Sequence, residues 1–477
     1  MELFVLLGLP FVMGLLVFAL RQDRWGKAVV FLTCSAHLFA ALNLWRGPRD
    51  LQFHPFLGLD AVGQLVLTIV SGLFFVVSIY LSGYLKEKRH RSNRVLMGCL
   101  LCLLSVMTMI AMSRHMGLLW ISLEAATLLS AFSINYDRTP QSIEATWKYL
   151  LISSVGVALG LLGTFFLAIS ATTIETVFLG DILRNATELS PSWLKLSVIF
   201  LLVGYGTKMG LAPMHTWKPD AYGEAPAPVG AIMAGALTAC AFLAIFRVTQ
   251  ICCHAGLREF LSPILILMGM LSLGIAAIFM TGQKDFNRML GYSSIEHMGI
   301  VVLGIGLGGA GVWAGRFHLI NNAFAKGLMF CVAGNLHQNF RTKKVANIQG
   351  VVHRLPVTGA FLIFGMVVIA GFPPFGIFYS ELLILREALS AQRYDVVAFY
   401  FFLLSVIFWG FSKGILSMAL GEPPGDVRND DVKKENLFMT MPLVILTVLL
   451  VFTGVFVPDA LYSLLDDASR LLPVIVE

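Results

Sequence analysis

The chain has 477 residues, of which 57% are hydrophobic and only 13% are charged, and its mean hydropathy is +0.80. A water-soluble domain carries about 25% charged residues, so this composition excludes a globular protein in water and makes the bilayer the solvent. The formal net charge of +6 does not indicate nucleic-acid binding. The basic residues lie in short clusters between apolar runs, which is the pattern that sets membrane orientation.

Apolar runs long enough to cross a bilayer as helices recur along the whole chain. They predict an all-α integral membrane protein with about fourteen transmembrane helices. We expect an N-terminal three-helix segment (1–93), two five-helix repeats (94–247 and 258–420), and a C-terminal loop with the last helix (421–477). The expected spans are residues 2–20, 26–46, 59–84, 94–113, 115–135, 142–171, 194–214, 224–247, 258–281, 288–309, 311–338, 357–390, 397–420 and 438–460.

Two of these spans are interrupted by glycine and proline. The seventh contains Gly210-Leu-Ala-Pro213 and the twelfth contains Gly371-Phe-Pro-Pro374. Proline removes a backbone donor and clashes with the preceding turn, so each helix should break there. Freed backbone inside a membrane is tolerated only beside a buried or wet cavity. Because the breaks lie five helices apart, we predict inverted repeats, helices 4–8 and 9–13, with a transport path beside broken helices 7 and 12.

Basic residues gather in the loops that follow odd-numbered helices. Cytoplasmic loops carry an excess of Lys and Arg. We therefore expect these loops in the cytoplasm and both termini on the outer face of a prokaryotic inner membrane. The set is Arg21, Arg24, Lys27, Lys86, Lys88, Arg89, Arg91, Arg94, Arg138, Lys218, Lys284, Arg288, Arg341, Lys343, Lys344, Arg354, Arg428, Lys433 and Lys434.

Four ionisable residues lie inside the predicted spans, where a charge costs about 2.5–3.5 kcal/mol. They are Glu124 in helix 5, Lys208 before the first break, Lys326 in helix 11 and Glu381 after the second break. Each residue could instead have a purely structural role, as a protonated acid hydrogen-bonded to a neighbouring helix or as an amine that snorkels to the interface. A carboxylate and an amine stabilise each other's charge, and separating them favours proton release by the amine and uptake by the acid. We therefore predict a proton relay near the bilayer midplane.

Further polar residues could extend this relay. The four-residue spacing of His318, Asn322 and Lys326 places three polar side chains on one helical face. His215 could link the first break to the cytoplasmic side, and Lys148 could be internal or snorkel to the interface. These further candidates are His318, His215, Glu296, His297 and Lys148.

The sequence contains no motif for a bound cofactor, metal or nucleotide. It has no Walker A pattern, and the glycines from Gly304 to Gly309 follow an apolar helix rather than a strand. Cys99 and Cys102 form a lone CxxC pair, and no cysteine cluster fits an iron–sulfur centre. Moving one charge against 100 mV takes about 2.3 kcal/mol. We therefore expect a subunit without redox centres, cofactor or metal, which draws its driving force from partner subunits.

One segment carries a family resemblance. It runs Lys208-Met-Gly-Leu-Ala-Pro-Met-His-Thr-Trp-Lys-Pro-Asp-Ala-Tyr-Gly-Glu-Ala-Pro226 and resembles K-x-x-x-x-P-x-H-x-W-L-P-D-A-x-x-x-A-P, the hallmark of the antiporter-like subunits of respiratory complex I. Residues 120–124, 292–299 and 380–385 add to a similarity over nearly the whole chain. The superfamily also includes Mrp antiporter subunits and membrane subunits of group 4 hydrogenases. Residues 141–150 look most like the F subunit of the hydrogenase-4 or formate hydrogenlyase type.

The resemblance implies roles for individual residues. Glu124 and Lys208 match the family's helix 5–helix 7 pair, Lys326 matches the central helix 11 lysine, and Glu381 occupies a helix 12 position that carries Lys or Glu. Ala239 stands where family members often have a helix 8 lysine, and Asn322 stands where some relatives have a second histidine, so the relay has fewer titratable steps.

The expected function is proton translocation within a redox-driven complex, an energy-converting hydrogenase or complex I-like oxidoreductase. The expected partners are other membrane subunits, a soluble hydrogenase or dehydrogenase arm, lipid, and protons or sodium. Two alternatives stay open: an Mrp-type sodium/proton antiporter module, and a non-conducting membrane anchor.

Overall fold

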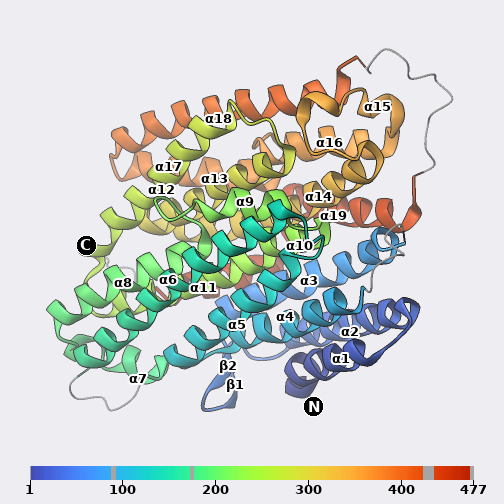
Figure 1. Ribbon diagram of the computed structural model, residues 1–477. Helices are drawn as coiled ribbons and strands as arrows, with labels where there is room; N and C mark the ends of the chain where they lie inside the picture. Colours follow the sequence, from blue (N-terminus) through green and yellow to red (C-terminus); the bar gives the residue numbers. More distant parts are fainter. Residues whose placement is uncertain (1, 87–92, 172–176, 423–434, 473–477) are drawn as a thin grey trace.

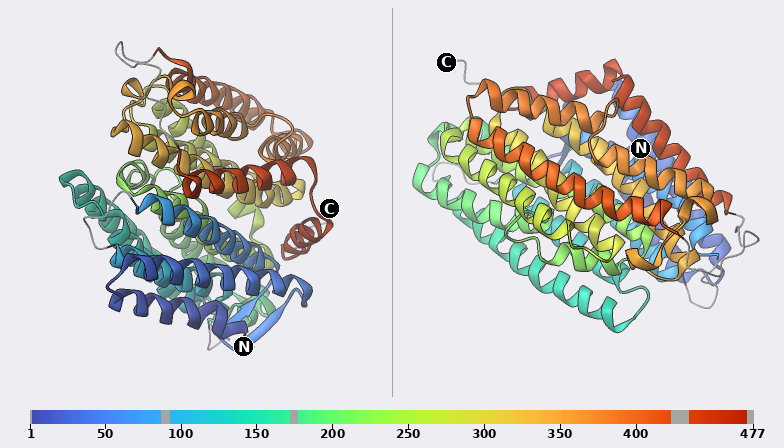
Figure 2. Two further views of the ribbon diagram at one scale, coloured as in Figure 1. Left: turned by 90° about the vertical axis from the view of Figure 1, so that its right-hand side faces the viewer. Right: turned by 90° about the horizontal axis from the view of Figure 1, so that it is seen from above.

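The computed structural model describes residues 2–86, 93–171, 177–422 and 435–472. Its long helices lie side by side and run roughly along one direction, as a bilayer-spanning bundle requires (Figures 1 and 2). Six of the basic residues predicted to be cytoplasmic lie outside the described residues: Lys88, Arg89, Arg91, Arg428, Lys433 and Lys434.

The first half of the bundle also holds a β-hairpin, in which strands β1 (Leu51–His54) and β2 (Leu57–Leu59) pair antiparallel. Two segments are π-helical. The first, η1 (Phe4–Gly8), precedes α1, and the second, η4 (Met233–Leu237), connects α10 to α11. The helices of this half are α1 (Leu9–Ala19), α2 (Asp23–Asn43), α3 (Ala61–Tyr84), α4 (Arg94–Met112), α5 (Met116–Ile134), α6 (Pro140–Ser170), α7 (Leu179–Arg184), α8 (Pro191–Met209), α9 (Trp217–Glu224), α10 (Ala227–Ile232) and α11 (Thr238–His254).

The second half is also helical in its described part, and it ends in a short amphipathic helix, α20. Its helices are α12 (Arg258–Met280), α13 (Phe286–Leu307), α14 (Gly309–Phe340), α15 (Val351–Arg354), α16 (Pro356–Ile369), α17 (Gly376–Ser390), α18 (Tyr394–Leu420), α19 (Leu437–Val455) and α20 (Asp459–Arg470).

Ten helices in the described residues are long and apolar enough to cross a membrane, which confirms the α-helical membrane class. The predicted spans 194–214 and 311–338 are helices α8 and α14, which do not meet this criterion. The predicted first span is a shorter apolar helix, Phe4–Ala19. The count of about fourteen spans, the inverted repeats and the proposed boundaries therefore stay predictions.

Both predicted helix breaks are present. Helix α8 ends at Met209 and is followed by Gly210, whose φ of +76° is left-handed, and the chain becomes helical again at Trp217. Such a C-terminal position favours glycine because a Cβ would be strained there. The second break has the same form: α16 ends at Ile369, Gly371 has a φ of +66°, and α17 begins at Gly376.

The centre of the bundle carries the polar residues. The most apolar windows of Ala227–His254 and α13 are 100% and 94% buried, whereas those of α6 and α18 are 39% and 33% buried. Helix α14, although polar for a membrane helix, is buried along most of its length. The outer helices therefore screen the ionisable side chains of α13 and α14 from lipid.

Candidate functional site

The first polar cluster surrounds the ammonium group of Lys208, one residue before α8 ends. Its Nζ donates to Thr127 Oγ1 and to Tyr149 OH, both at 2.7 Å, and lies 4.9 Å from the centre of the Tyr149 ring. The Tyr149 hydroxyl is in turn 2.6 Å from Ser130 Oγ. Lys208 is only 1% exposed. A buried lysine held by hydroxyl groups can exchange its proton without a direct carboxylate contact.

Glu124 lies one helical turn before Thr127 on α5. Its Oε1 accepts a hydrogen bond from Ser154 Oγ at 3.1 Å, and its buried Oε2 has no partner. Glu124 and Lys208 interact electrostatically, although no ion pair joins them within 4 Å in the described part of the chain. The expected acid and amine therefore interact electrostatically, and Thr127, which accepts a hydrogen bond from Lys208, lies three residues after Glu124 on the same helix.

The second polar cluster, on α13 and α14, also combines a lysine, a hydroxyl group and a carboxyl group. Lys326 is fully buried, and its Nζ donates to Ser293 Oγ at 2.5 Å. Ser293 lies three residues before Glu296, which is 4% exposed and interacts electrostatically with Lys326. One oxygen of Glu296 and both polar atoms of Asn322 are buried without a hydrogen-bond partner in the protein. The expected polar stripe on α14 therefore faces the bundle interior.

A histidine pair continues the second cluster toward the break between α16 and α17. His297 Nδ1 and His318 Nε2 are 2.9 Å apart, and His318 Nδ1 is 2.9 Å from Ser380 Oγ. Glu381 follows Ser380, and Gly371 at the break leaves room for it: a Cβ there would lie 2.3 Å from Glu381 Oε2. The sequence-predicted residues Glu296, His297, His318, Lys326 and Glu381 therefore form one group.

This group also has metal-binding character. His297, His318 and Glu381 offer ligand atoms within 4.8 Å of one another, and two imidazoles with a carboxylate form a donor set that zinc accepts. Both ring nitrogens of His318 are already hydrogen-bonded, as a proton-sharing pair also requires. The prediction of no metal and no cofactor therefore stays a prediction.

Among the described residues, the side chains of Lys148 and His215 make no hydrogen bond to either cluster, and His215 interacts electrostatically with Lys218. The side chain of Lys148 is 46% exposed and forms ion pairs with Glu144 at 2.7 Å and Asp220 at 3.1 Å. Arg288 joins this network through Asp220, and the network lines a polar surface pocket of about 130 Å³. His215 lies in the first break, mostly buried, with Nδ1 unpartnered. A relay role for Lys148 and His215 stays a prediction.

One buried cation was assigned wrongly from the sequence. Lys218 was expected in a cytoplasmic loop, but it lies on the first turn of α9 and is fully buried. Its Nζ donates to Met209 O at 2.7 Å and is 3.5 Å from Ser294 O. A signal was present in the sequence: the family pattern W-L-P-D has an apolar residue where this chain has lysine.

Sequence reasoning also missed two buried arginines. Arg247 on α11 forms an ion pair with Asp60, the N-cap residue of α3, and both side chains are buried. Arg316, two residues before His318, donates to Ala468 O at 2.7 Å and so holds the end of α20. Their partners lie 187 and 152 residues away, so no local pattern predicts these contacts.

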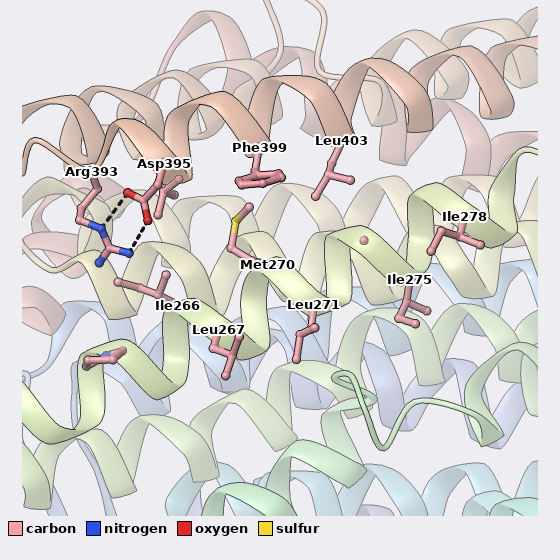
Figure 3. A pocket seen from close by; sticks show the side chains of 13 residues that line it. Ile266, Leu267, Met270, Leu271, Ile275, Ile278, Arg393, Asp395, Phe399 and Leu403 are labelled. Atoms are coloured by element: carbon pink, nitrogen blue, oxygen red, sulfur yellow. Dashed lines mark hydrogen bonds and ion pairs between the residues drawn. The ribbon is translucent and has the colours of Figure 1, made fainter.

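A groove of about 440 Å³ lies away from both clusters, between α12 and α18. Figure 3 shows its apolar lining, with Met270 and Leu271 on one wall and Phe399 and Leu403 on the other. The ion pair of Arg393 with Asp395, at 2.9 Å, lies at one end of it. None of the predicted site residues lines this groove, so it is not the candidate site.

The fold and the two clusters define a class of protein: a polytopic helical membrane protein with buried, interacting acids and amines beside broken helices. The family described as NADH:quinone oxidoreductase/Mrp antiporter, TM, matches residues 113–408. The chain belongs to this family. It is 34% identical over 376 residues, 78% of this chain and 78% of the relative, to the hydrogenase-4 component F homolog of Methylacidiphilum infernorum (isolate V4).

Two solved structures share the fold. A chain of the membrane-bound sulfane sulfur reductase, an archaeal respiratory membrane complex, superposes with a TM-score of 0.89 at 21% identity, covering 99% of this chain and 97% of that chain. A chain of the Mrp complex from Dietzia sp. DQ12-45-1b gives a TM-score of 0.87 at 18% identity, with coverage of 99% and 97%. The resemblance proposed from residues 208–226 is confirmed at the level of the family.

Proposed function

We propose that this chain is a proton-translocating membrane subunit of a redox-driven complex. The observation that carries the proposal is a repeated arrangement: a buried lysine donates to a hydroxyl that lies three residues from a carboxylate. Lys208, Thr127 and Glu124 form one such group, and Lys326, Ser293 and Glu296 form the other. The charge on each of these groups affects the proton affinity of its neighbours, so gain or loss of a proton at one group alters the proton affinity of the next.

The chain works with other membrane subunits, as its relatives in multi-subunit complexes do. We infer that a soluble hydrogenase or dehydrogenase arm supplies the driving force, because moving one charge against 100 mV takes about 2.3 kcal/mol. The loop charges support an orientation in a prokaryotic inner membrane with both termini on the outer face. Similarity to hydrogenase-4 component F favours a hydrogenase as the parent complex.

An Mrp-type sodium/proton antiporter module is the second candidate. Its support is the family itself, which includes Mrp antiporters, together with the free carboxylate oxygens of Glu124 and Glu296, because hard cations prefer oxygen ligands. In proteoliposomes, transport that responds to sodium at fixed pH would favour this reading, and transport independent of sodium would reject it.

The test of the main proposal compares Glu124→Gln and Lys208→Met in the intact complex, reconstituted in proteoliposomes. Redox turnover and pH-dye signals are recorded together. We expect assembly and electron transfer to continue while proton movement per electron is lost. Lys195→Met is the matched control, because Lys195 lies on the same helix α8 but is exposed. Unchanged proton movement in both relay variants would reject the proposal and favour the alternative that the chain is a non-conducting membrane anchor.

A further inference from the structure

We propose that Lys218 carries protons between the two lysine clusters. It would supply the titratable amine that is missing at position 239, where this chain has alanine. The inference rests on the proposed function and deepens it by adding one residue to the relay. Lys218 belongs to neither cluster, yet its side chain lies between residues of both.

The contacts of the Lys218 ammonium group bridge the clusters. On one side Nζ donates to the carbonyl oxygen of Met209, the residue after Lys208, at 2.7 Å. On the other side it lies 3.5 Å from the carbonyl oxygen of Ser294. Ser294 follows Ser293, whose hydroxyl accepts the hydrogen bond of Lys326. Lys218 interacts electrostatically with Lys326 and with His297. A single titratable group therefore adjoins both halves of the relay.

Helix α9 holds Lys218 in this position. Trp217 donates its indole N–H to Thr207 O at 2.8 Å, which ties the first turn of α9 to the last turn of α8. Gly210 leaves room for the lysine stem, because a Cβ there would lie 2.5 Å from Lys218 Cδ. The glycine therefore serves both the left-handed backbone and the path of the side chain.

The chemistry of Lys218 suits a carrier. No carboxylate lies within ion-pair distance of it among the described residues, and its two acceptors are backbone carbonyl groups that cannot take a proton. Protonated amines repel each other, so a proton on Lys326 favours proton loss from Lys218, and the reverse. In each step one N–H bond breaks on the donor and one forms on the acceptor, and no electron is transferred.

A structural role must be separated from this carrier role, because an ammonium group that bonds Met209 O also satisfies a carbonyl freed at the end of α8. Two substitutions distinguish them. Lys218→Gln keeps a hydrogen-bond donor but cannot carry a proton. Lys218→Arg keeps the donor and the charge, but arginine does not deprotonate in proteins.

The experiment measures proton movement per electron in the reconstituted intact complex, with redox turnover and subunit assembly as fold controls. We expect both variants to assemble and turn over electrons while redox-linked proton movement falls about 100-fold, the size of effect for one lost proton-transfer group. If either variant fails to assemble, the other decides. Retained proton movement in an assembled Gln or Arg variant overturns the carrier role.

Lys208→Met and Lys195→Met run in parallel. If Lys208→Met stops proton movement while the Lys218 variants do not, the inference fails and the proposed function stands. If Lys208→Met also leaves proton movement unchanged, the proposed function fails. Lys195→Met reports any loss caused by removing a lysine from α8 as such, and it should behave as the unmodified complex does.

Discussion

The buried ion pair between Asp60 and Arg247 gives a quantitative test of how α3 and α11 are held together. Arg247 Nη2 donates to Asp60 Oδ1 at 2.8 Å, Nη1 bonds the other carboxylate oxygen, and Nη1 also donates to Gln250 Oε1 at 2.8 Å. Asp60 Oδ1 accepts from Gly63 N at 2.8 Å and so caps α3. Asp60→Asn removes the charge and retains an oxygen for the cap.

The expected loss of stability follows from charge and burial. Burial alone raises the pKa of the Asp60 carboxyl, but the charge and hydrogen bonds of Arg247 outweigh burial and lower the pKa from 3.8 to about 2. That difference corresponds to about 2.5 kcal/mol, and removing one partner of a buried pair costs about 3–5 kcal/mol. We therefore expect Asp60→Asn to lower the free energy of unfolding by about 3 kcal/mol at neutral pH.

The pH dependence has a defined sign. Because the folded pKa lies below the unfolded one, the stabilisation is complete above about pH 4 and is lost as the pH falls toward 2. The difference between the unmodified protein and Asp60→Asn should therefore shrink over that interval.

The assay is unfolding by rising SDS fraction in mixed micelles, followed by tryptophan fluorescence. Asp50→Asn is the matched control, because Asp50 pairs with Arg114 but its side chain is 78% exposed, and exposed pairs contribute about 0–1 kcal/mol. Equal losses for Asp50→Asn and Asp60→Asn, or a loss under about 1 kcal/mol at Asp60, would refute this reasoning.

Three further outcomes follow from the geometry. Ser293→Ala removes the hydroxyl that accepts the hydrogen bond of Lys326, so redox-linked proton movement should fall about 100-fold or more with assembly retained. An unchanged ratio of protons to electrons would argue against a role for this contact. Gly371→Ala places a methyl group 2.3 Å from Glu381 Oε2, at a position whose backbone is left-handed. Backbone strain alone should lower the free energy of unfolding by about 1–2 kcal/mol, as measured by the same SDS titration. A variant as stable as the unmodified protein would contradict this expectation. Lys148→Met removes a half-exposed amine from surface ion pairs, so its free energy of unfolding should change by less than about 1 kcal/mol, and a larger loss would mean that the surface network is buried in the assembled protein.

Much of the site could be predicted because local patterns carry it. The four-residue spacing of His318, Asn322 and Lys326 fixes them on one face of α14 whatever that helix packs against. The glycines and prolines at the two breaks act through the backbone of their own segment. The placement of Glu124 and Lys326 within membrane-spanning helices followed from the length of the apolar runs, although only Lys326 is fully buried.

The remainder depends on packing between distant segments. Lys218 lies beside proline and aspartate in a polar stretch, which is typical of an interfacial loop, and only the docking of α9 against α8 and α13 buries it. Arg247 lies in the middle of α11 and Arg316 lies about two turns into α14. Arg247 is buried against Asp60, and Arg316 is buried against the end of α20. No periodic pattern in the sequence predicts either of these contacts.

The hydroxyl groups of Thr127 and Ser293 have a consequence for the timing of transport. Each accepts a hydrogen bond from an amine at a position one helical turn from the acid that balances its charge, so rotation about side-chain bonds changes the separation of the two charges. Rotamer changes of side chains occur far faster than collective helix motions. An electron-transfer event elsewhere in the complex can therefore alter the relay by biasing the torsion angles of Thr127 and Ser293, on a timescale shorter than that of helix movement.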